Sequence, residues 1–129
     1  MKIKKLLIAI ALIASCTFAK AESTANLIDC SAMLGMGYLL SEMTLQSAPQ
    51  YSRDKYEKRK NFFLQGRLNL LKQARKNPDF ISEKDWNNRT TKQMGEIKKE
   101  FQYASAETVN ESIAICISVA NLRMADFPQ

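Results

Sequence analysis

The chain has 129 residues and a formal net charge of +6, and it contains no histidine. Its length accommodates one domain. Four of the 19 basic residues lie within residues 1–21, which hold no acidic residue, so residues 22–129 carry 15 basic and 13 acidic side chains, a net charge of +2. This near balance argues against a nucleic-acid-binding protein.

The first 21 residues have the pattern of a secretory signal peptide. Lysines precede an apolar run over residues 6–14, and Ala19-Lys20-Ala21 has the small residues of a cleavage site. The run is shorter than the roughly 20 apolar residues that span a bilayer, and no later segment is long enough. We therefore predict cleavage before Glu22, export to the periplasm and a mature domain over residues 22–129.

Cys16 leaves a second processing route open. Residues 13–16 read Ile-Ala-Ser-Cys, which resembles a lipoprotein processing box whose cysteine becomes the acylated first residue. The protein would then be anchored to the membrane at Cys16, with residues 16–25 as a short tether. The Ala-Lys-Ala site is closer to the preferred pattern, so we favour ordinary cleavage.

Two cysteines, Cys30 and Cys116, remain after ordinary cleavage. An even number of cysteines in an oxidising compartment indicates a disulfide. The alternative is a pair of buried free thiols. Two cysteines without any histidine do not make a zinc site.

Long patterns of helical period predict helices throughout the mature chain. The first is expected from Ala25 to Ser47, with Ser23 or Thr24 as its cap. It is apolar around most of its circumference, so it should be central or covered by a second copy of the chain. The second is expected from Arg53 to Asn77, capped by Ser52 and ended by Pro78.

The third and fourth helices should begin at serines. Ser82 and Asp85 form an approximate capping box, and the fourth helix starts near Ser105, with an apolar stripe that continues to Met124. Four aromatic or branched side chains are expected in one core: Phe63, Trp86, Phe101 and Ile113.

Short connections between four helices predict an all-α fold, a small four-helix up-down bundle. In that topology the first and last helices are antiparallel neighbours, which places Cys30 and Cys116 at the same height. We therefore predict one disulfide that links the first and last helices.

The sequence shows no catalytic constellation. There is no Gly-x-Ser-x-Gly nucleophile motif and no glycine-rich phosphate loop. The acidic pair Glu83 and Asp85 lies in a helix-capping region, where a structural role suffices. We expect no enzymatic activity, no metal and no cofactor.

The second helix concentrates positive charge. Over residues 53–77 it has nine basic and two acidic side chains, a net +7, so the rest of the mature chain sums to −5. Such an asymmetry favours a partner with an acidic surface, and we predict contacts through Lys55, Arg59 and Lys76. The alternative is a solvated helix face balanced by acids on neighbouring helices. In that case the interface would be the apolar surface of the first helix around Met33, Met36 and Tyr38.

Two cations of the second helix lie close to its apolar stripe. Lys60 would be level with Glu42 of the first helix, so either an ion pair with Glu42 or snorkelling to solvent accounts for it. Arg67 would be level with Gly35 and Gly37, which leave room for its stem.

These features favour a non-enzymatic periplasmic protein that acts by protein–protein contact. An inhibitor or immunity protein against a periplasmic toxin or a cell-wall enzyme is the concrete form of this hypothesis. The alternative is a stress chaperone that holds unfolded clients on the methionines and leucines of the first helix. A homodimer through that helix is a further expectation.

Overall fold

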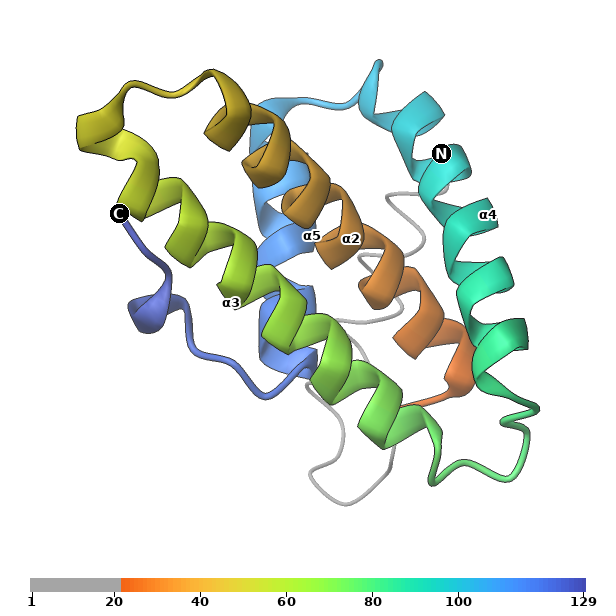
Figure 1. Ribbon diagram of the computed structural model, residues 1–129. Coiled ribbons are helices and arrows are strands. Elements are labelled where there is room, and N and C mark those ends of the chain that lie inside the picture. Colours follow the sequence, from red (N-terminus) through yellow and green to blue (C-terminus); the bar gives the residue numbers. More distant parts are fainter. Residues whose placement is uncertain (1–21) are drawn as a thin grey trace.

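The computed structural model describes residues 22–129, which form four α-helices and one 3-10 helix (Figure 1). The helices are α2 (Thr24–Ser47), α3 (Gln50–Ala74), α4 (Glu83–Phe101) and α5 (Ala106–Val119), and the 3-10 helix is η1 (Met124–Asp126). Residues 22–129 contain no strand, so the predicted all-α fold is confirmed. The predicted signal peptide, including Cys16, lies outside the described residues.

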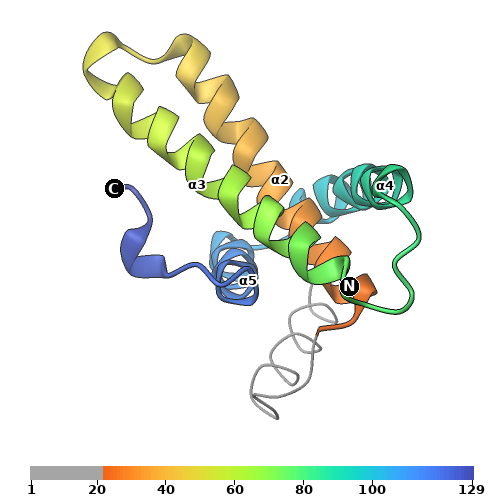
Figure 2. The same ribbon diagram turned by 60° about the horizontal axis from the view of Figure 1, so that its bottom comes forward.

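Helix α2 is the centre of the fold. It packs against α3, α4 and α5, and Figure 2 shows α4 and α5 on either side of the α2–α3 hairpin. Its first half is buried on nearly every side, from Leu27 to Gly35. This agrees with the central position that its apolar circumference predicts.

Glycines let α2 and α3 approach each other closely. A Cβ atom on Gly37 would lie 2.7 Å from the ring of Phe63, and one on Gly66 would lie 2.7 Å from Leu34 Cδ1. On each helix, a glycine therefore leaves the space that a large side chain of the other helix occupies. The close approach also places Arg67 Cζ 3.6 Å from the Cβ position of Gly35, as the predicted register requires.

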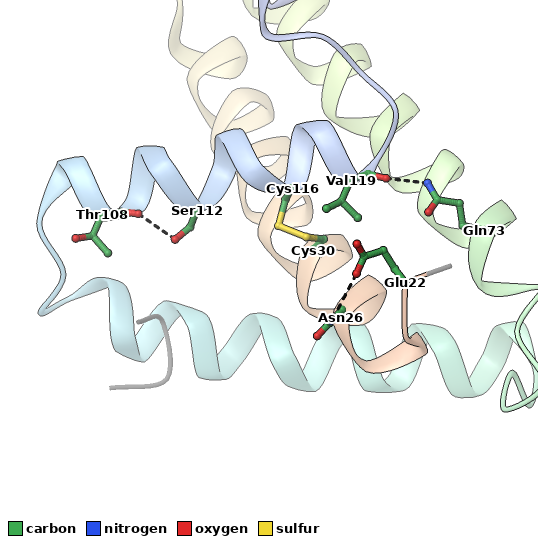
Figure 3. The surroundings of a disulfide bond; sticks show 8 residues. All are labelled: Glu22, Asn26, Cys30, Gln73, Thr108, Ser112, Cys116 and Val119. Carbon is green, nitrogen blue, oxygen red and sulfur yellow. Dashed lines mark hydrogen bonds between the residues drawn. A yellow bond between two sulfur atoms is a disulfide. The ribbon is translucent and has the colours of Figure 1, made fainter. Parts of the chain in front are cut away.

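The predicted disulfide is confirmed (Figure 3). Cys30 and Cys116 are fully buried, with their Cα atoms 5.0 Å apart, and they join α2 to α5. Two side chains of α3 hold the end of α5: Gln73 Nε2 donates to Val119 O at 2.8 Å, and Asn69 Nδ2 donates to Ala120 O at 2.9 Å. The last helix is thus fixed to both members of the hairpin.

Three helices begin at the expected serines. The hydroxyl oxygens of Ser23, Ser82 and Ser105 accept backbone N–H groups three residues on, which satisfies donors that a helix start leaves free. Helix α3 differs: it begins at Gln50 after Pro49, before the predicted cap, and ends at Ala74 rather than Asn77. The predicted cap by Ser52 is wrong, because its hydroxyl donates to Pro49 O within the first turn.

Helix α5 ends at Val119, earlier than its apolar stripe predicts. Asn121 has φ 59°, and Leu122 N–H donates to Ile117 O at 3.0 Å. This left-handed residue and the long-range bond form a Schellman-type helix end. The chain then turns back along α3, and Met124 falls in η1.

The core joins the four large side chains that were expected to share it. Phe63 and Trp86 are buried, whereas Phe101 and Ile113 are half-buried and pack against the same cluster.

Candidate binding site

The α2–α3 hairpin projects beyond α4 and α5 (Figure 2). We call its outer part, residues 37–63, the hairpin tip. Large apolar side chains are exposed there: Leu40 is 57%, Met43 64% and Tyr51 90% accessible. Exposed apolar side chains that gather on one projecting element mark an interaction surface more often than a solvated one.

A groove runs along one side of the hairpin tip. Its cavity measures about 190 Å³, and α2, α3, α5 and the C-terminal segment all contribute to it. Its walls are mainly apolar: Gly37, Leu40, Tyr56, Phe63, Ile113 and Phe127, with Ser41, Thr44 and Arg59 as the polar members. The groove is therefore a composite of segments that are far apart in the sequence.

The C-terminal segment forms one wall through an aromatic cluster. The ring centroid of Phe127 lies 5.4 Å from that of Phe62 and 5.7 Å from that of Phe63, both in edge-on arrangements. Such arrangements match the charge distribution of aromatic rings. They hold the end of the chain against α3.

Arg59 lies in this wall. Its Nε donates to Pro128 O at 2.8 Å, and its guanidinium lies 5.1 Å from the ring centroid of Phe127 and 5.5 Å from that of Tyr56. Within residues 22–129 it forms no ion pair with a carboxylate. A cation is thus held in a fixed place at the edge of an apolar groove.

The other cations of the tip fall into two groups. Lys58 pairs with Asp54 at 3.0 Å and Lys60 with Glu57 at 3.4 Å, each within one turn of α3. Lys55 is half-buried, with its Nζ 5.5 Å from the Tyr56 ring centroid, and Arg53 Nη1 donates to Leu45 O at 3.2 Å. Like Arg59, these two cations have no carboxylate partner in the described region. Of the two alternatives left open for Lys60, an ion pair with Glu42 or snorkelling to solvent, the ion pair is not the one formed: Lys60 pairs with Glu57 of its own helix.

Lys76 is remote from this site. It lies in the turn after α3, about 30 Å from Lys55 along the axis at a helical rise of about 1.5 Å per residue. There it borders a polar depression with Asn69, Lys72, Gln73 and Asn121. The structure therefore brings Lys55 and Arg59 together and separates Lys76 from both.

The alternative interface around Met33, Met36 and Tyr38 is largely closed. Met33 is completely buried, and the other two are half-buried against the core. The exposed apolar residues of α2 come later in the helix, at Leu39, Leu40 and Met43. The sequence does not show that the exposed apolar residues come so late in α2, because their exposure depends on where α4 and α5 cease to cover that helix.

A second cavity lies between α2 and α4 and measures about 270 Å³. Asp29, Arg89 and Lys92 are among its lining residues. Burial is the larger cause and the negative charge of Glu100 the smaller one; together they raise the pKa of Asp29 to about 6. Arg89 forms an ion pair with Asp85 of its own helix, at 3.6 Å.

Neither a metal centre nor a membrane span stands out in residues 22–129. No three cysteine or acidic side chains gather there in a way that would hold a metal ion. None of the helices formed by these residues combines the length and apolar character needed to cross a bilayer.

The chain matches no protein-family model, no curated protein and no solved structure. The functional argument therefore rests on the groove, its cations and the exposed apolar residues of the hairpin tip.

Proposed function

We propose that this protein is an exported, non-enzymatic binding protein that acts by protein–protein contact through the hairpin tip. One observation carries the proposal: Arg59, a cation without a carboxylate partner among the described residues, lies in the wall of an exposed apolar groove. An apolar centre with a charged edge is the usual composition of a protein interface.

The size of the groove supports a macromolecular partner. Small-molecule pockets usually enclose about 300–1,000 Å³, and this cavity has only about 190 Å³. Met43 and Tyr51, which are exposed on the same hairpin tip but do not line the groove, would stay exposed around a small ligand. A protein partner would cover the groove and these side chains together.

The charge of α3 supports an acidic partner. Seven basic and two acidic side chains lie in residues 50–74, a net +5. Charges at the rim of an interface mainly speed association by long-range attraction. The proposed partner is a periplasmic toxin or a cell-wall enzyme with an acidic surface, which this protein would inhibit or neutralise.

The proposed location is the periplasm. The pattern of residues 1–21 supports export, and the Cys30–Cys116 bridge is typical of an oxidising compartment. The intact mass of protein isolated from its host would distinguish a chain beginning at Glu22 from one acylated at Cys16.

Two other uses of the same surface compete with this proposal. Exposed Leu39, Leu40 and Met43 favour a chaperone that holds unfolded clients, because flexible apolar side chains adapt to many sequences. They would also fit a homodimer through α2. Light scattering of the purified domain detects a dimer, and suppression of aggregation of several unrelated unfolded proteins detects a chaperone.

Site-specific crosslinking in the host tests the main proposal. A photoreactive residue in place of Met43, at the tip, should yield one dominant crosslinked protein. The same residue in place of Lys99, which is exposed on α4, should not. A diffuse smear of many proteins from position 43 would favour the chaperone.

Association rates with the identified partner then locate the charged surface. Lys55→Glu should slow association at least fivefold at low salt, and the effect should shrink as salt rises because ions screen such attraction. Lys76→Glu is the matched variant from the opposite end of α3. If only Lys55→Glu slows association, the tip is the interface, and if both do, the interface extends along α3. Unchanged rates for both would contradict a functional role for these cations.

A further inference from the structure

We infer that the groove receives one aromatic side chain from an acidic segment of the partner, and that Arg59 binds a carboxylate next to that side chain. The inference rests on the proposed function and specifies the chemistry of the bound segment. It is argued from the size of the groove, its polar groups and the way Arg59 is held.

The groove has the size of a single aromatic ring with its linker. Apolar cavities of about 150 Å³ in proteins accommodate benzene, and this one has about 190 Å³. Three of its walls are the rings of Tyr56, Phe63 and Phe127, which offer edge-on contacts to a fourth ring. Filling such a pocket with one large side chain is the typical form of an interface hot spot.

The two aliphatic hydroxyl groups of the groove make no demand on a ligand. Ser41 Oγ donates to Gly37 O at 2.9 Å, and Thr44 Oγ1 donates to Leu40 O at 2.8 Å. Both of these hydroxyl hydrogens are therefore used within α2. An apolar side chain can cover them without leaving either donor unpaired, which would be costly in a covered site.

Arg59 differs from these hydroxyls because it keeps free donors. A guanidinium has five N–H groups, and one of them, at Nε, is used by Pro128 O. The terminal N–H groups are suited to paired binding of a carboxylate. Lys55, on the same stretch of α3 and likewise without an acidic partner in residues 22–129, adds to the positive potential.

The end of the chain is a positioning element in this arrangement. The guanidinium lies near the rings of Phe127 and Tyr56 and donates to Pro128 O. A side chain held before binding loses less conformational entropy when the partner arrives. The C-terminal residues therefore contribute to binding through Arg59 as well as through the Phe127 wall.

Peptide binding tests the inference directly. The probe is a fluorescein-labelled 12-residue peptide with one Phe among Glu and Asp residues, and its anisotropy is followed during titration with the full mature chain. Replacing its Phe by Ala should weaken binding at least tenfold, and replacing its acids by Lys should abolish it. Equal binding of the Phe and Ala peptides would overturn the aromatic pocket.

Variants of the protein locate the bound peptide. Thr44→Trp fills the groove and should weaken binding at least tenfold, whereas Asn88→Trp, at an exposed position of α4 outside the hairpin tip, should leave it unchanged. Arg59→Gln and removal of residues 127–129 should each remove most of the preference for acidic over neutral Phe peptides. Because the truncated chain could lose binding by misfolding, Phe127→Leu is a second test of the same wall. It keeps an apolar side chain there and should retain part of the affinity.

The outcomes separate this inference from the proposed function. Failure of every peptide to bind, or equal loss with Thr44→Trp and Asn88→Trp, overturns the inference. The proposed function is decided independently by the crosslink from position 43. If one partner is crosslinked but no peptide binds, the proposed function stands and the inference about the groove fails: the tip binds a protein, but the groove does not receive its aromatic side chain.

Discussion

The ionisation of Asp29 is coupled to folding. Its carboxyl is half-buried between α2 and α4, and burial together with Glu100 raises its pKa from 3.8 to about 6. The folded protein therefore binds this proton more tightly than the unfolded chain. Between pH 3.8 and pH 6 this residue lowers the free energy of unfolding as pH rises, and above pH 6 its full destabilising effect is present.

Replacing Asp29 by Asn should therefore stabilise the protein at neutral pH. The amide cannot ionise, so we expect a gain of about 1–2 kcal/mol at pH 7 after allowing for solvent screening, and almost none at pH 4. Urea unfolding of variant and wild type at pH 4, 5, 6 and 7 measures the difference. The same Asp-to-Asn change at Asp54, an exposed residue of α3, is the control for the substitution itself. A difference that is constant over this range would contradict the raised pKa.

Arg67 and Lys60 show how far single residues could be predicted. The sequence places Arg67 beside Gly35 correctly, because the glycine leaves space at that level. Its Nε is buried without a hydrogen-bond partner, and burial lowers the pKa of Arg67. For Lys60 the sequence left two alternatives open, a partner on the first helix or snorkelling to solvent, and the observed partner is Glu57, one turn away on α3. The register of two helices can be predicted from their patterns, but the ion pair that one side chain forms depends on its rotamer.

At the scale of helices, the approach of α2 to α3 depends on Gly37 and Gly66. An added methyl group at Gly37 would lie 2.7 Å from the Phe63 ring, which is itself packed against Phe62 and Phe127. Gly95 on α4 is the natural contrast, because nothing lies within 4 Å of its Cβ position.

The same substitution should therefore act in opposite directions at these glycines. Gly37→Ala should destabilise the protein by about 1–3 kcal/mol through overpacking. Gly95→Ala should stabilise it by about 0.5–1 kcal/mol, because alanine favours a helix interior. Thermal and urea unfolding measure both. A stabilising Gly37→Ala would show that the ring of Phe63 moves freely and that the helices are less tightly packed.

Helix boundaries were predictable where a side chain caps them. The three serine caps are local in sequence, so the pattern alone locates them. The start of α3 and the end of α5 were wrong for a common reason. Helix α3 begins directly after Pro49, and α5 ends before Asn121, whose φ is positive. The spacing of apolar residues carries no information about either backbone conformation.

At the scale of the molecule, the helix order and the disulfide were predictable but the groove was not. The disulfide was predicted by placing Cys30 and Cys116 at the same height of the first and last helices. In the structure the bridge forms where α5 crosses α2 (Figure 3). The groove joins residues 37–44, residues 56–63, Ile113 and Phe127. Its last wall exists only because the chain reverses at Asn121 and returns along α3. Nothing in the local sequence shows where such a reversal leads.

The disulfide determines how firmly the last helix is held. Helix α5 packs chiefly against α2, and it carries Ile113 and leads to Phe127, both of which line the groove. The bridge joins residues separated by 86 positions. Constraining an unfolded loop of that length contributes about 4–5 kcal/mol in chain-entropy terms, whereas measured effects are usually about 2–4 kcal/mol.

The double variant Cys30→Ala/Cys116→Ala should therefore lose about 2–4 kcal/mol of stability, measured by urea unfolding. Its helix content at 20 °C should stay unchanged, because the buried packing of α2 against α5 remains. Alanine is chosen over serine so that no unpaired hydroxyl is placed at a fully buried position. The reduced wild-type protein provides the matched control and should unfold with the same midpoint as the variant. A loss below about 1 kcal/mol would show that the links of Asn69 and Gln73 to the end of α5, with the packing on α2, hold the helix without the bridge.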